Sequence, residues 1–390
     1  MTSRRGFLQT SAALLSASAA FSQTKKVIAY VGAYSSPQGP EGSRGRGSGI
    51  HMFEMNSASG VLTAKEVFES DINPVWLEVN SDRSRLYSAN EVSNGSVSAF
   101  AVDRASGRLT LLNRVGSGGE GPTHLSIHPS GKWVLVANYA AGKVAVLPIL
   151  QDGKLGEASD VQEDHGAPGP PRATSAPEGS FAISGHDHPH AHMVQADPSG
   201  RFVLAADLGL DCIVVWKFDA AEGKLSDPER AALPPGDGPR HFVFHPNGRR
   251  LYSLQEEAST LVTFDFDPST GRLTARQTIS TLPKSFRGTN FTSGIRISPD
   301  ARFIYISNRL HDSIAWFPIA KDGTLRFGGE EWTRGDYPRS LTIDPSGNFL
   351  FSCNQRGDAV TSFRINRQTG ALAFTGHYTP VGTPSILTFL

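Results

Sequence analysis

The amino-acid sequence predicts an all-β fold, a seven-bladed β-propeller whose blades each hold four antiparallel strands. A phrase of two apolar strands joined by a turn built on Pro or Asp recurs six times, at steps of 48, 69, 48, 53 and 46 residues. A period of this size that carries strands and no helices is typical of propeller blades. In addition, the chain ends in a lone apolar strand, and its N-terminal segment holds only three.

Each repeat contains the same four elements. Two apolar strands flank the turn, a third strand and a Gly-containing turn follow, and a fourth strand ends the repeat. Alternation of apolar and polar residues along these strands indicates half-buried β-structure, so we expect one blade per repeat. The residues that mark the six turns are Ser81, Pro129, Pro198, Pro246, Pro299 and Pro345.

The seventh blade is predicted to be composite. Three strands are expected before the first repeat, at residues 27–34, 50–56 and 61–68, and one after the last repeat, at residues 384–390. The C-terminal strand then takes the first place in the N-terminal blade and closes the ring, which hides the sheet edges. Seven blades of roughly 50 residues fill residues 24–390 and leave no room for a second domain.

Residues 1–23 are expected to be a twin-arginine signal peptide. Residues 3–8 read Ser-Arg-Arg-Gly-Phe-Leu, and an Ala- and Leu-rich run at residues 11–21 follows with small residues suited to cleavage. That run is too short to span a bilayer. We therefore expect a periplasmic or secreted protein, exported by the twin-arginine route and free of the membrane after signal cleavage. The alternative is a disordered basic N-terminus.

The composition excludes several classes of function. Lys and Arg number 37 and Asp and Glu number 37, so no electrostatic footprint for nucleic acid or an anionic membrane is present. The sequence has no Gly-rich phosphate loop, no Cys-x-x-Cys pair and no Gly-x-Ser-x-Gly elbow, and we expect no cofactor. The two cysteines, Cys212 and Cys353, fall on different blades and are expected to be buried thiols without a disulfide.

Residues that break the repeat at equivalent positions mark the candidate site. The first strand of a blade runs along the central channel, so positions six before and ten after the turn residue reach one mouth of that channel. We call these the rim positions. Six before the turn stand Val75, Thr123, His192, Arg240, Ser293 and Arg339. Ten after it stand Glu91, Tyr139, Leu208, Glu256, Arg309 and Gln355. They vary in charge and size, as expected of residues that line a site.

The position nine after the turn is Asn, Asp or Gln in every repeat, which predicts a scaffold role, with the side chain bonding backbone in the turn between the second and third strands. Among the rim positions, His192, Arg240 and Glu256 are the leading candidates for a polar pocket. Arg240 and Glu256 share one hairpin and His192 comes from the preceding blade, so the three can meet. An ordinary cross-strand ion pair and a histidine that satisfies a turn carbonyl remain the alternative.

The stretch from His186 to His192 holds four histidines. Alternate histidines on a strand share one face and could bind a divalent ion. Pro189 interrupts the strand, however, and no carboxylate stands at an established metal spacing, so we expect a loop that belongs to the active site and no metal. An insertion at about residues 163–185 precedes it, and we expect a flexible loop over the same rim that acts as a lid.

Several short sequence motifs together resemble those of the seven-bladed propeller lactonases. This family includes propeller-type 6-phosphogluconolactonases and fungal carboxy-muconate lactonising enzymes. The resemblance covers nearly everything after the signal. The motifs lie at residues 189–192, 207–211, 238–242, 295–299, 307–309 and 311–314, together with Glu256. This resemblance implies catalytic roles for His192, Arg240, Glu256 and Arg296. Substrate contacts are expected from His190, His241, Arg309 and Arg339. The family usually has Glu directly before its Ile-Arg pair, where this chain has Gly294.

The resemblance implies hydrolysis of a sugar-acid lactone, with a small-molecule substrate and a monomeric protein. Arg240 and Arg296 would hold an anionic group and stabilise the oxyanion, while His192 takes the proton from water and Glu256 pairs with Arg240. Glu256 as the base remains open. Because an export signal is expected, an extracellular aldonolactone is an alternative to a phosphorylated lactone. Two other hypotheses also remain, a muconate-type lactonising cycloisomerase and a non-catalytic binding propeller.

Overall fold

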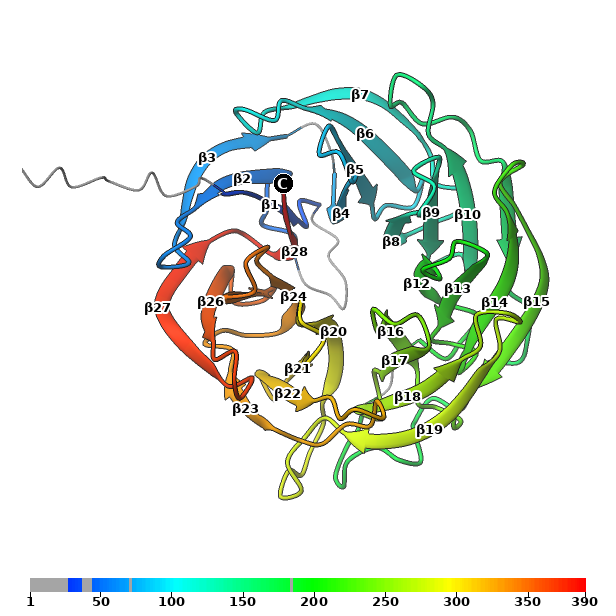
Figure 1. The fold of residues 1–390 in the computed structure, drawn as a ribbon, viewed down its shortest axis with the longest axis vertical. Helices are drawn as coiled ribbons and strands as arrows, with labels where there is room; N and C mark the ends of the chain where they lie inside the picture. The colour runs from blue at the N-terminus through cyan, green and yellow to red at the C-terminus, as the bar shows by residue number, and fades with distance from the viewer. Residues whose placement is uncertain (1–26, 37–43, 70–71, 183–184) are drawn as a thin grey trace, which may run out of the picture.

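The computed structural model describes residues 27–36, 44–69, 72–182 and 185–390. These residues form seven four-stranded antiparallel sheets, arranged in a ring around a central channel (Figure 1). The predicted seven-bladed, all-β propeller is thereby confirmed. The signal peptide expected at residues 1–23 lies outside the described residues. Within the described part of the chain, no helix is long and apolar enough to cross a membrane.

The strands of each blade run from the channel outward. The innermost strands are β28 (Pro384–Phe389), β4 (Pro74–Val79), β8 (Pro122–Ile127), β12 (Ala191–Ala196), β16 (Pro239–Phe244), β20 (Phe291–Ile297) and β24 (Pro338–Ile343). The second strands are β1 (Val27–Ala33), β5 (Arg85–Asn90), β9 (Trp133–Asn138), β13 (Phe202–Asp207), β17 (Arg250–Gln255), β21 (Phe303–Arg309) and β25 (Phe349–Asn354). The third strands are β2 (Ile50–Met55), β6 (Ser96–Val102), β10 (Lys143–Pro148), β14 (Cys212–Asp219), β18 (Thr260–Phe266), β22 (Ser313–Pro318) and β26 (Ala359–Ile365). The outermost strands are β3 (Leu62–Phe68), β7 (Leu109–Gly116), β11 (Asp160–Glu163), β15 (Lys224–Ala232), β19 (Leu273–Ser280), β23 (Gly329–Trp332) and β27 (Leu372–Pro380).

The composite blade closes the ring as predicted. Strand β28 pairs antiparallel with β1, with Ala29 opposite Phe389 and Gly32 opposite Ile386. Strands β2 and β3 complete the sheet. The first and last described strands therefore lie side by side, and β28, drawn in dark red, sits against the blue β1 (Figure 1).

The hydrophobic core lies between neighbouring blades. Trp133 and Leu135 of β9, for example, pack in one buried cluster with Val194 of β12 and Val203 of β13. A recurring hydrogen bond adds to this contact, in which a buried second-strand tyrosine donates to a glycine carbonyl in the outer turn of the next blade. The pairs are Tyr30 with Gly107, Tyr87 with Gly153, Tyr252 with Gly323 and Tyr305 with Gly370.

The residues nine after each turn are buried scaffold residues, but most of them do not bond the backbone of the turn between the second and third strands, as the prediction had it. Asn138 donates from Nδ2 to the carbonyl of Ser117 at 2.9 Å, and Asn308 does the same to Thr281 at 3.1 Å. The carboxylate of Asp207 accepts hydrogen bonds from the backbone of its own blade. All three side chains are fully buried, so each one satisfies backbone groups that water cannot reach.

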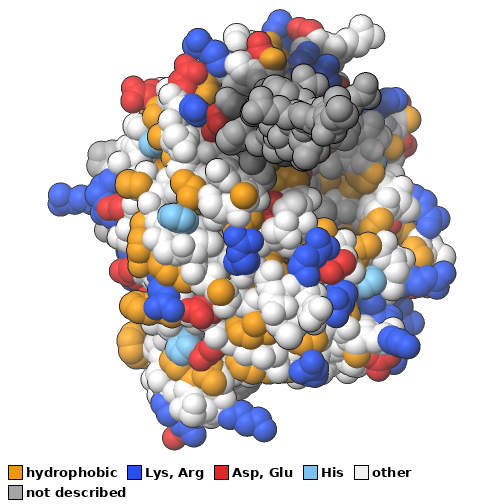
Figure 2. Space-filling view, turned by 60° about the vertical axis from the view of Figure 1, so that its left-hand side comes forward, with side chains coloured by type: hydrophobic (Ala, Val, Ile, Leu, Met, Phe, Trp, Pro, Cys, Tyr) orange, Lys and Arg blue, Asp and Glu red, His pale blue; other side chains and the backbone are white. Residues whose placement is uncertain are grey.

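Both cysteines are free and buried, as expected from the repeat register. Burial raises the pKa of each thiol to about 12. On the face drawn in Figure 2, basic and acidic side chains are interspersed, which agrees with the balanced charge of the sequence.

Most inner strands have a β-bulge near their first residue, at the mouth of the channel where the cavity residues lie. The register of five inner strands shifts at the residue six before the turn, which is left without a pairing partner. Bulges turn a side chain away from the pleat of the sheet. The bulge residues are Val75, Thr123, His192, Arg240 and Arg339. The first set of rim positions is thus structurally distinct as well as variable in sequence.

Candidate functional site

A cavity of about 550 Å³ opens where the inner strands begin. Eight of the twelve rim positions line it. From the bulges come Thr123, His192, Arg240 and Arg339, and from the ends of the second strands come Glu91, Tyr139, Glu256 and Arg309. Side chains from six repeats therefore converge on one space.

Glu256 joins two arginines from different blades. Its Oε2 lies 2.7 Å from Nε of Arg240 and 2.6 Å from Nη2 of Arg309. The three side chains are between 1 and 7% exposed. Burial by itself would raise the pKa of Glu256, but the charges of Arg309 and Arg240 outweigh it, and the pKa lies below its ordinary value. Glu256 is therefore an anion whose main contacts are with the two guanidinium groups.

Arg240 is held at several points. Its Nη1 donates to the carbonyl of Ser293 at 2.6 Å and lies 3.4 Å from Nε2 of His241. Burial, together with the nearby charge of Arg309, lowers the pKa of Arg240 to about 9. The guanidinium remains charged at neutral pH and is fixed in direction. Such a group is a preorganised donor for negative charge that develops nearby.

A second ion pair also lines the cavity. Arg339 Nη2 is 3.8 Å from Oε2 of Glu91, and the hydroxyl of Tyr34 donates to the same carboxylate. The Arg339 guanidinium also lies 5.1 Å from the centre of the Tyr34 ring. Four arginines (240, 309, 339 and 356) and two glutamates line the cavity, so their formal charges sum to +4 − 2 = +2. The cavity is therefore suited to an anionic ligand.

His192 lines the cavity as a buried imidazole that is 6% exposed. Its Nδ1 has no hydrogen-bond partner on any other described residue. Burial, followed by the charges of Arg240 and Arg339, lowers the pKa of His192 well below its usual range. The imidazole is consequently neutral at pH 7 and can accept a proton.

One wall of the cavity is aromatic and was not predicted. Phe291 and Tyr337 lie eight positions before their turns, and Leu310 and Arg356 lie eleven after. The guanidinium of Arg309 is close to both rings, 5.4 Å from the centre of Phe291 and 5.0 Å from that of Tyr337. The exposed Arg356 stacks on Tyr337 at 3.8 Å. These four residues lie two positions before, or one position after, the rim positions that were considered in each repeat.

Three predicted site residues do not line this cavity. Arg296 lies further down the channel, where it stacks on Trp76 at 5.5 Å and interacts electrostatically with Glu78. Its likeness to a family motif predicts a catalytic role, but the inner strand carries it past the irregularity at Ser293 and Gly294 and away from the cavity lining. His241 packs beneath the cavity against His192 and Trp76, with ring centres 5.0 and 5.4 Å away.

His190 is the third, and it stands behind the cavity wall. Its ring stacks on Tyr139 with centres 4.3 Å apart, and it is 5% exposed. Of the eight predicted site residues, the structure thus gathers His192, Arg240, Glu256, Arg309 and Arg339 around one space.

The insertion connects β11 to β12 and crosses the rim. Gly185 lines the cavity, and His186 is buried with Nε2 3.1 Å from a carboxylate oxygen of Asp211. Further along the rim, Ser175 donates to Asp237 at 2.6 Å, and Gly288 donates to the carbonyl of Glu178 at 2.8 Å. The segment therefore lies over the predicted rim, and its action as a lid stays a prediction.

Gly294 has no room for a side chain. A Cβ at this position would stand 2.9 Å from the backbone nitrogen of Leu341 and 3.1 Å from Oγ of Ser307. The irregularity of β20 spans two residues, Ser293 and Gly294, and brings the backbone against β24. The glutamate that the resemblance leads one to expect before the Ile-Arg pair could not be placed here without moving the strands apart.

Comparison with known proteins gives consistent matches over the whole ring. A family model described as "Lactonase, 7-bladed beta-propeller" matches residues 28–389. The 6-phosphogluconolactonase of Bacillus subtilis is 31% identical over 367 residues, which cover 94% of this chain and 99% of that protein. A 6-phosphogluconolactonase of Formosa agariphila is 32% identical over 337 residues, 84% of this chain and 91% of the relative. The solved structure of the periplasmic gluconolactonase of Pseudomonas aeruginosa is 28% identical, with a TM-score of 0.82 over 94% of this chain and 99% of that one.

Proposed function

The chain belongs to the seven-bladed β-propeller lactonase family, and we propose that it hydrolyses a sugar-acid lactone in the cavity at the channel mouth. The observation that carries the proposal is the meeting of a neutral, buried His192 with fixed arginines around one space. Hydrolysis of a lactone needs a base for water and a cation for the oxyanion, and these residue types supply both.

His192 is the proposed base. It removes a proton from water as the water oxygen attacks the lactone carbonyl carbon, and the carbonyl oxygen becomes an oxyanion that Arg240 stabilises. When the bond from this carbon to the ring oxygen breaks, the imidazolium returns its proton to the leaving oxygen, and the free sugar acid results. Glu256 is less suited to be the base because its pKa is lowered and its oxygen faces two guanidinium groups.

Glu256 is therefore proposed as a positioning residue. By pairing with Arg240 and Arg309 at once, it fixes two donors that would otherwise repel each other in a dry site. Arg339 and Arg356, on other parts of the lining, are proposed to hold an anionic group of the substrate. The formal charge of +2 favours a lactone that carries phosphate or carboxylate. Binding of that anion would offset the cationic charges that lower the pKa of His192 and so make it a stronger base.

The proposal is tested by hydrolysis of 6-phosphogluconolactone and glucono-δ-lactone with purified mature protein, after subtraction of spontaneous opening. We expect turnover above background that falls by roughly 10²- to 10⁴-fold in His192→Ala. The exposed His377 of β27 provides a matched control, and His377→Ala should retain full turnover. Wild-type rates equal to spontaneous opening on both lactones, or an active His192→Ala, would overturn the assignment.

We also propose that the mature protein is periplasmic, that the twin-arginine route exports it, and that it acts as a monomer. The Arg4-Arg5 motif supports export, and the Pseudomonas aeruginosa neighbour is itself a periplasmic protein. Cell fractionation should find the processed chain in the periplasm, and replacing both arginines with lysine should retain it in the cytoplasm. Light scattering of the mature protein should give the mass of one chain.

A further inference from the structure

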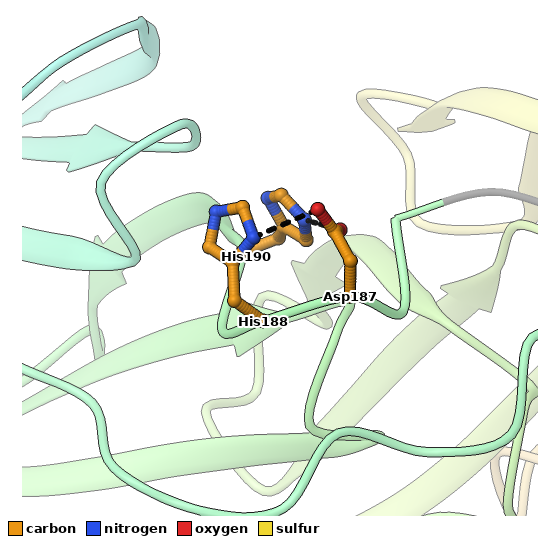
Figure 3. A group of neighbouring side chains, drawn as sticks. All are labelled: Asp187, His188 and His190. Atoms are coloured by element: carbon orange, nitrogen blue, oxygen red, sulfur yellow. Dashed lines mark hydrogen bonds and ion pairs between the residues drawn. The ribbon is translucent and has the colours of Figure 1, made fainter.

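Three side chains with metal-binding atoms gather where the insertion meets β12. Asp187, His188 and His190 lie together there, and the ligand atoms that they offer are all within 4.8 Å of one another (Figure 3). Oδ1 of Asp187 is 2.7 Å from Nε2 of His190, and its Oδ2 is 3.0 Å from Nδ1 of His188. One carboxylate thus faces a ring nitrogen of each histidine.

The opposite nitrogen of each ring faces a backbone carbonyl. Nε2 of His188 lies 3.0 Å from the carbonyl oxygen of Ala140, and Nδ1 of His190 lies 3.0 Å from that of Tyr139. A carbonyl oxygen only accepts hydrogen bonds, so the nitrogen beside it must carry the proton. In a neutral ring, the nitrogen beside Asp187 then presents a lone pair.

This arrangement is unfavourable when both rings are neutral and no cation lies between them. The lone pairs of two neutral imidazoles would point at a carboxylate that also only accepts hydrogen bonds. A single divalent ion between the three groups satisfies both lone pairs and the carboxylate together.

We propose that Asp187, His188 and His190 bind one divalent transition-metal ion of the zinc type. Two imidazole nitrogens and a carboxylate oxygen form a ligand set that suits zinc or cobalt, whereas calcium and magnesium prefer oxygen ligands alone. The carbonyls of Ala140 and Tyr139 supply the outer hydrogen bonds that commonly orient metal-binding histidines.

The site is open to solvent on one side. The side chain of Asp187 is 75% exposed and that of His188 is 44% exposed, while that of His190 is 6% exposed. Ligand atoms about 2.0–2.2 Å from an ion stand somewhat more than 3 Å apart, so a small shift of the exposed carboxylate admits the metal. Water would complete the coordination.

The proposed ion would act on the cavity wall and not inside it. None of its three ligands lines the cavity, but His190 stacks on Tyr139, which does. The carbonyls that hold the two histidines belong to the turn between β9 and β10. An ion here would tie the end of the insertion to that turn. No established metal spacing is visible in the sequence, because Asp187 is adjacent in the chain to one ligand and reaches the other where the loop folds back.

Calorimetric titration of the untagged mature protein tests this site, after removal of metals with a chelator. With zinc chloride and with cobalt chloride, we expect one ion per chain. The cobalt complex should show visible absorption bands that indicate nitrogen and oxygen ligands. Asp187→Asn and His188→Ala change exposed side chains, so both variants should fold, and each should weaken binding by at least about tenfold. His377→Ala, which changes an exposed histidine elsewhere, should bind as the wild type does.

Two results would overturn the proposal. One is the absence of saturable binding of either metal by the wild-type protein. The other is binding that Asp187→Asn and His188→Ala leave unchanged, which would assign the ion to another part of the surface. Because the readout is binding, the result does not depend on whether the protein hydrolyses a lactone.

Discussion

Arg240 and Glu256 face each other across the β16–β17 hairpin as an ion pair in which Nε lies 2.7 Å from Oε2. Their side chains are only 2 and 7% exposed. On a protein surface, such a cross-strand pair contributes little, because water screens both charges. Here water is largely excluded, and Arg309 shares the same carboxylate oxygen. The carboxylate of Glu256 is therefore the counter-charge for two buried arginines, Arg240 and Arg309.

Replacing Glu256 with glutamine should destabilise the protein markedly. The amide keeps the size of the side chain but leaves two buried guanidinium groups without a counter-charge, and loss of one partner from a buried pair costs about 3–5 kcal/mol. Urea unfolding at pH 7 measures the change. Glu331→Gln breaks a partly exposed pair with Arg334 and should cost less than about 1 kcal/mol. Equal effects of the two substitutions would contradict a special role for the buried pair.

The pH dependence of hydrolysis should locate the base. The pKa of His192 in the free protein is below its usual value of 6.5, so kcat/KM should remain level as the pH falls to 6.5 and decline only below it. A bound anion offsets the nearby cationic charges, so the decline of kcat should occur at higher pH than that of kcat/KM. Rates corrected for spontaneous opening provide the test. Residual activity of His192→Ala should lack this decline, and its persistence there would assign the titration to another group.

Arg356 should distinguish charged from neutral lactones. Its exposed guanidinium rests on Tyr337 at the cavity lining, so Arg356→Ala should leave the fold intact. Loss of one charge-assisted contact of about 1.5–3 kcal/mol should raise KM for 6-phosphogluconolactone by roughly 10- to 150-fold. KM for glucono-δ-lactone should change little. Arg104→Ala, at an exposed turn far from the cavity, is the control, and a similar loss on both lactones would argue against anion recognition by Arg356.

A methyl group at position 294 should destabilise the folded protein. Gly294→Ala brings Cβ to 2.9 Å from the backbone of Leu341, and overpacking of this kind costs typically about 1–3 kcal/mol. Gly116→Ala in β7 is a matched control, because its Cβ meets nothing within 4 Å. Thermal unfolding of both variants compares them. If Gly294→Ala were as stable as Gly116→Ala, the close approach of β20 to β24 would not explain the missing side chain.

Removal of the last seven residues should open the ring. Without residues 384–390, β1 loses the pairing that runs from Ala29 to Ala33, and the buried contacts of Ile386 and Leu387 are lost as well. Exposed strand edges promote association, so the truncated protein should aggregate or unfold at lower temperature. Removing Leu390 alone, which is only partly buried, should have a small effect. A soluble, monomeric truncated protein with the wild-type melting temperature would contradict this.

The sequence could predict the blades because each one repeats the same local pattern. It could also predict most of the cavity, since a residue at a fixed distance from the turn reaches the same mouth of the channel in every repeat. Phe291 and Tyr337 were not predicted as cavity residues because they lie two residues before the strand irregularity, outside the rim positions. Arg296 was misplaced relative to the cavity because likeness to a motif does not report depth along a strand.

The cluster of Asp187, His188 and His190 shows a different limit of prediction from sequence. Its geometry depends on a loop that turns back on itself and on two carbonyls from the preceding blade, Tyr139 and Ala140. Neither the turn of that loop nor its neighbours follow from periodicity. Sequence reasoning is therefore strongest where the chain repeats and weakest in the one long insertion.

The pairing of β1 with β28 also determines how the molecule can assemble. Six blades consist of strands that follow one another in the chain, so their contacts are local and can form early. Among the strands that the structure describes, only those of the composite blade join residues as distant in the chain as Ala29 and Phe389. Completion of the circle is thus a single long-range event, after which the cavity has all of its walls.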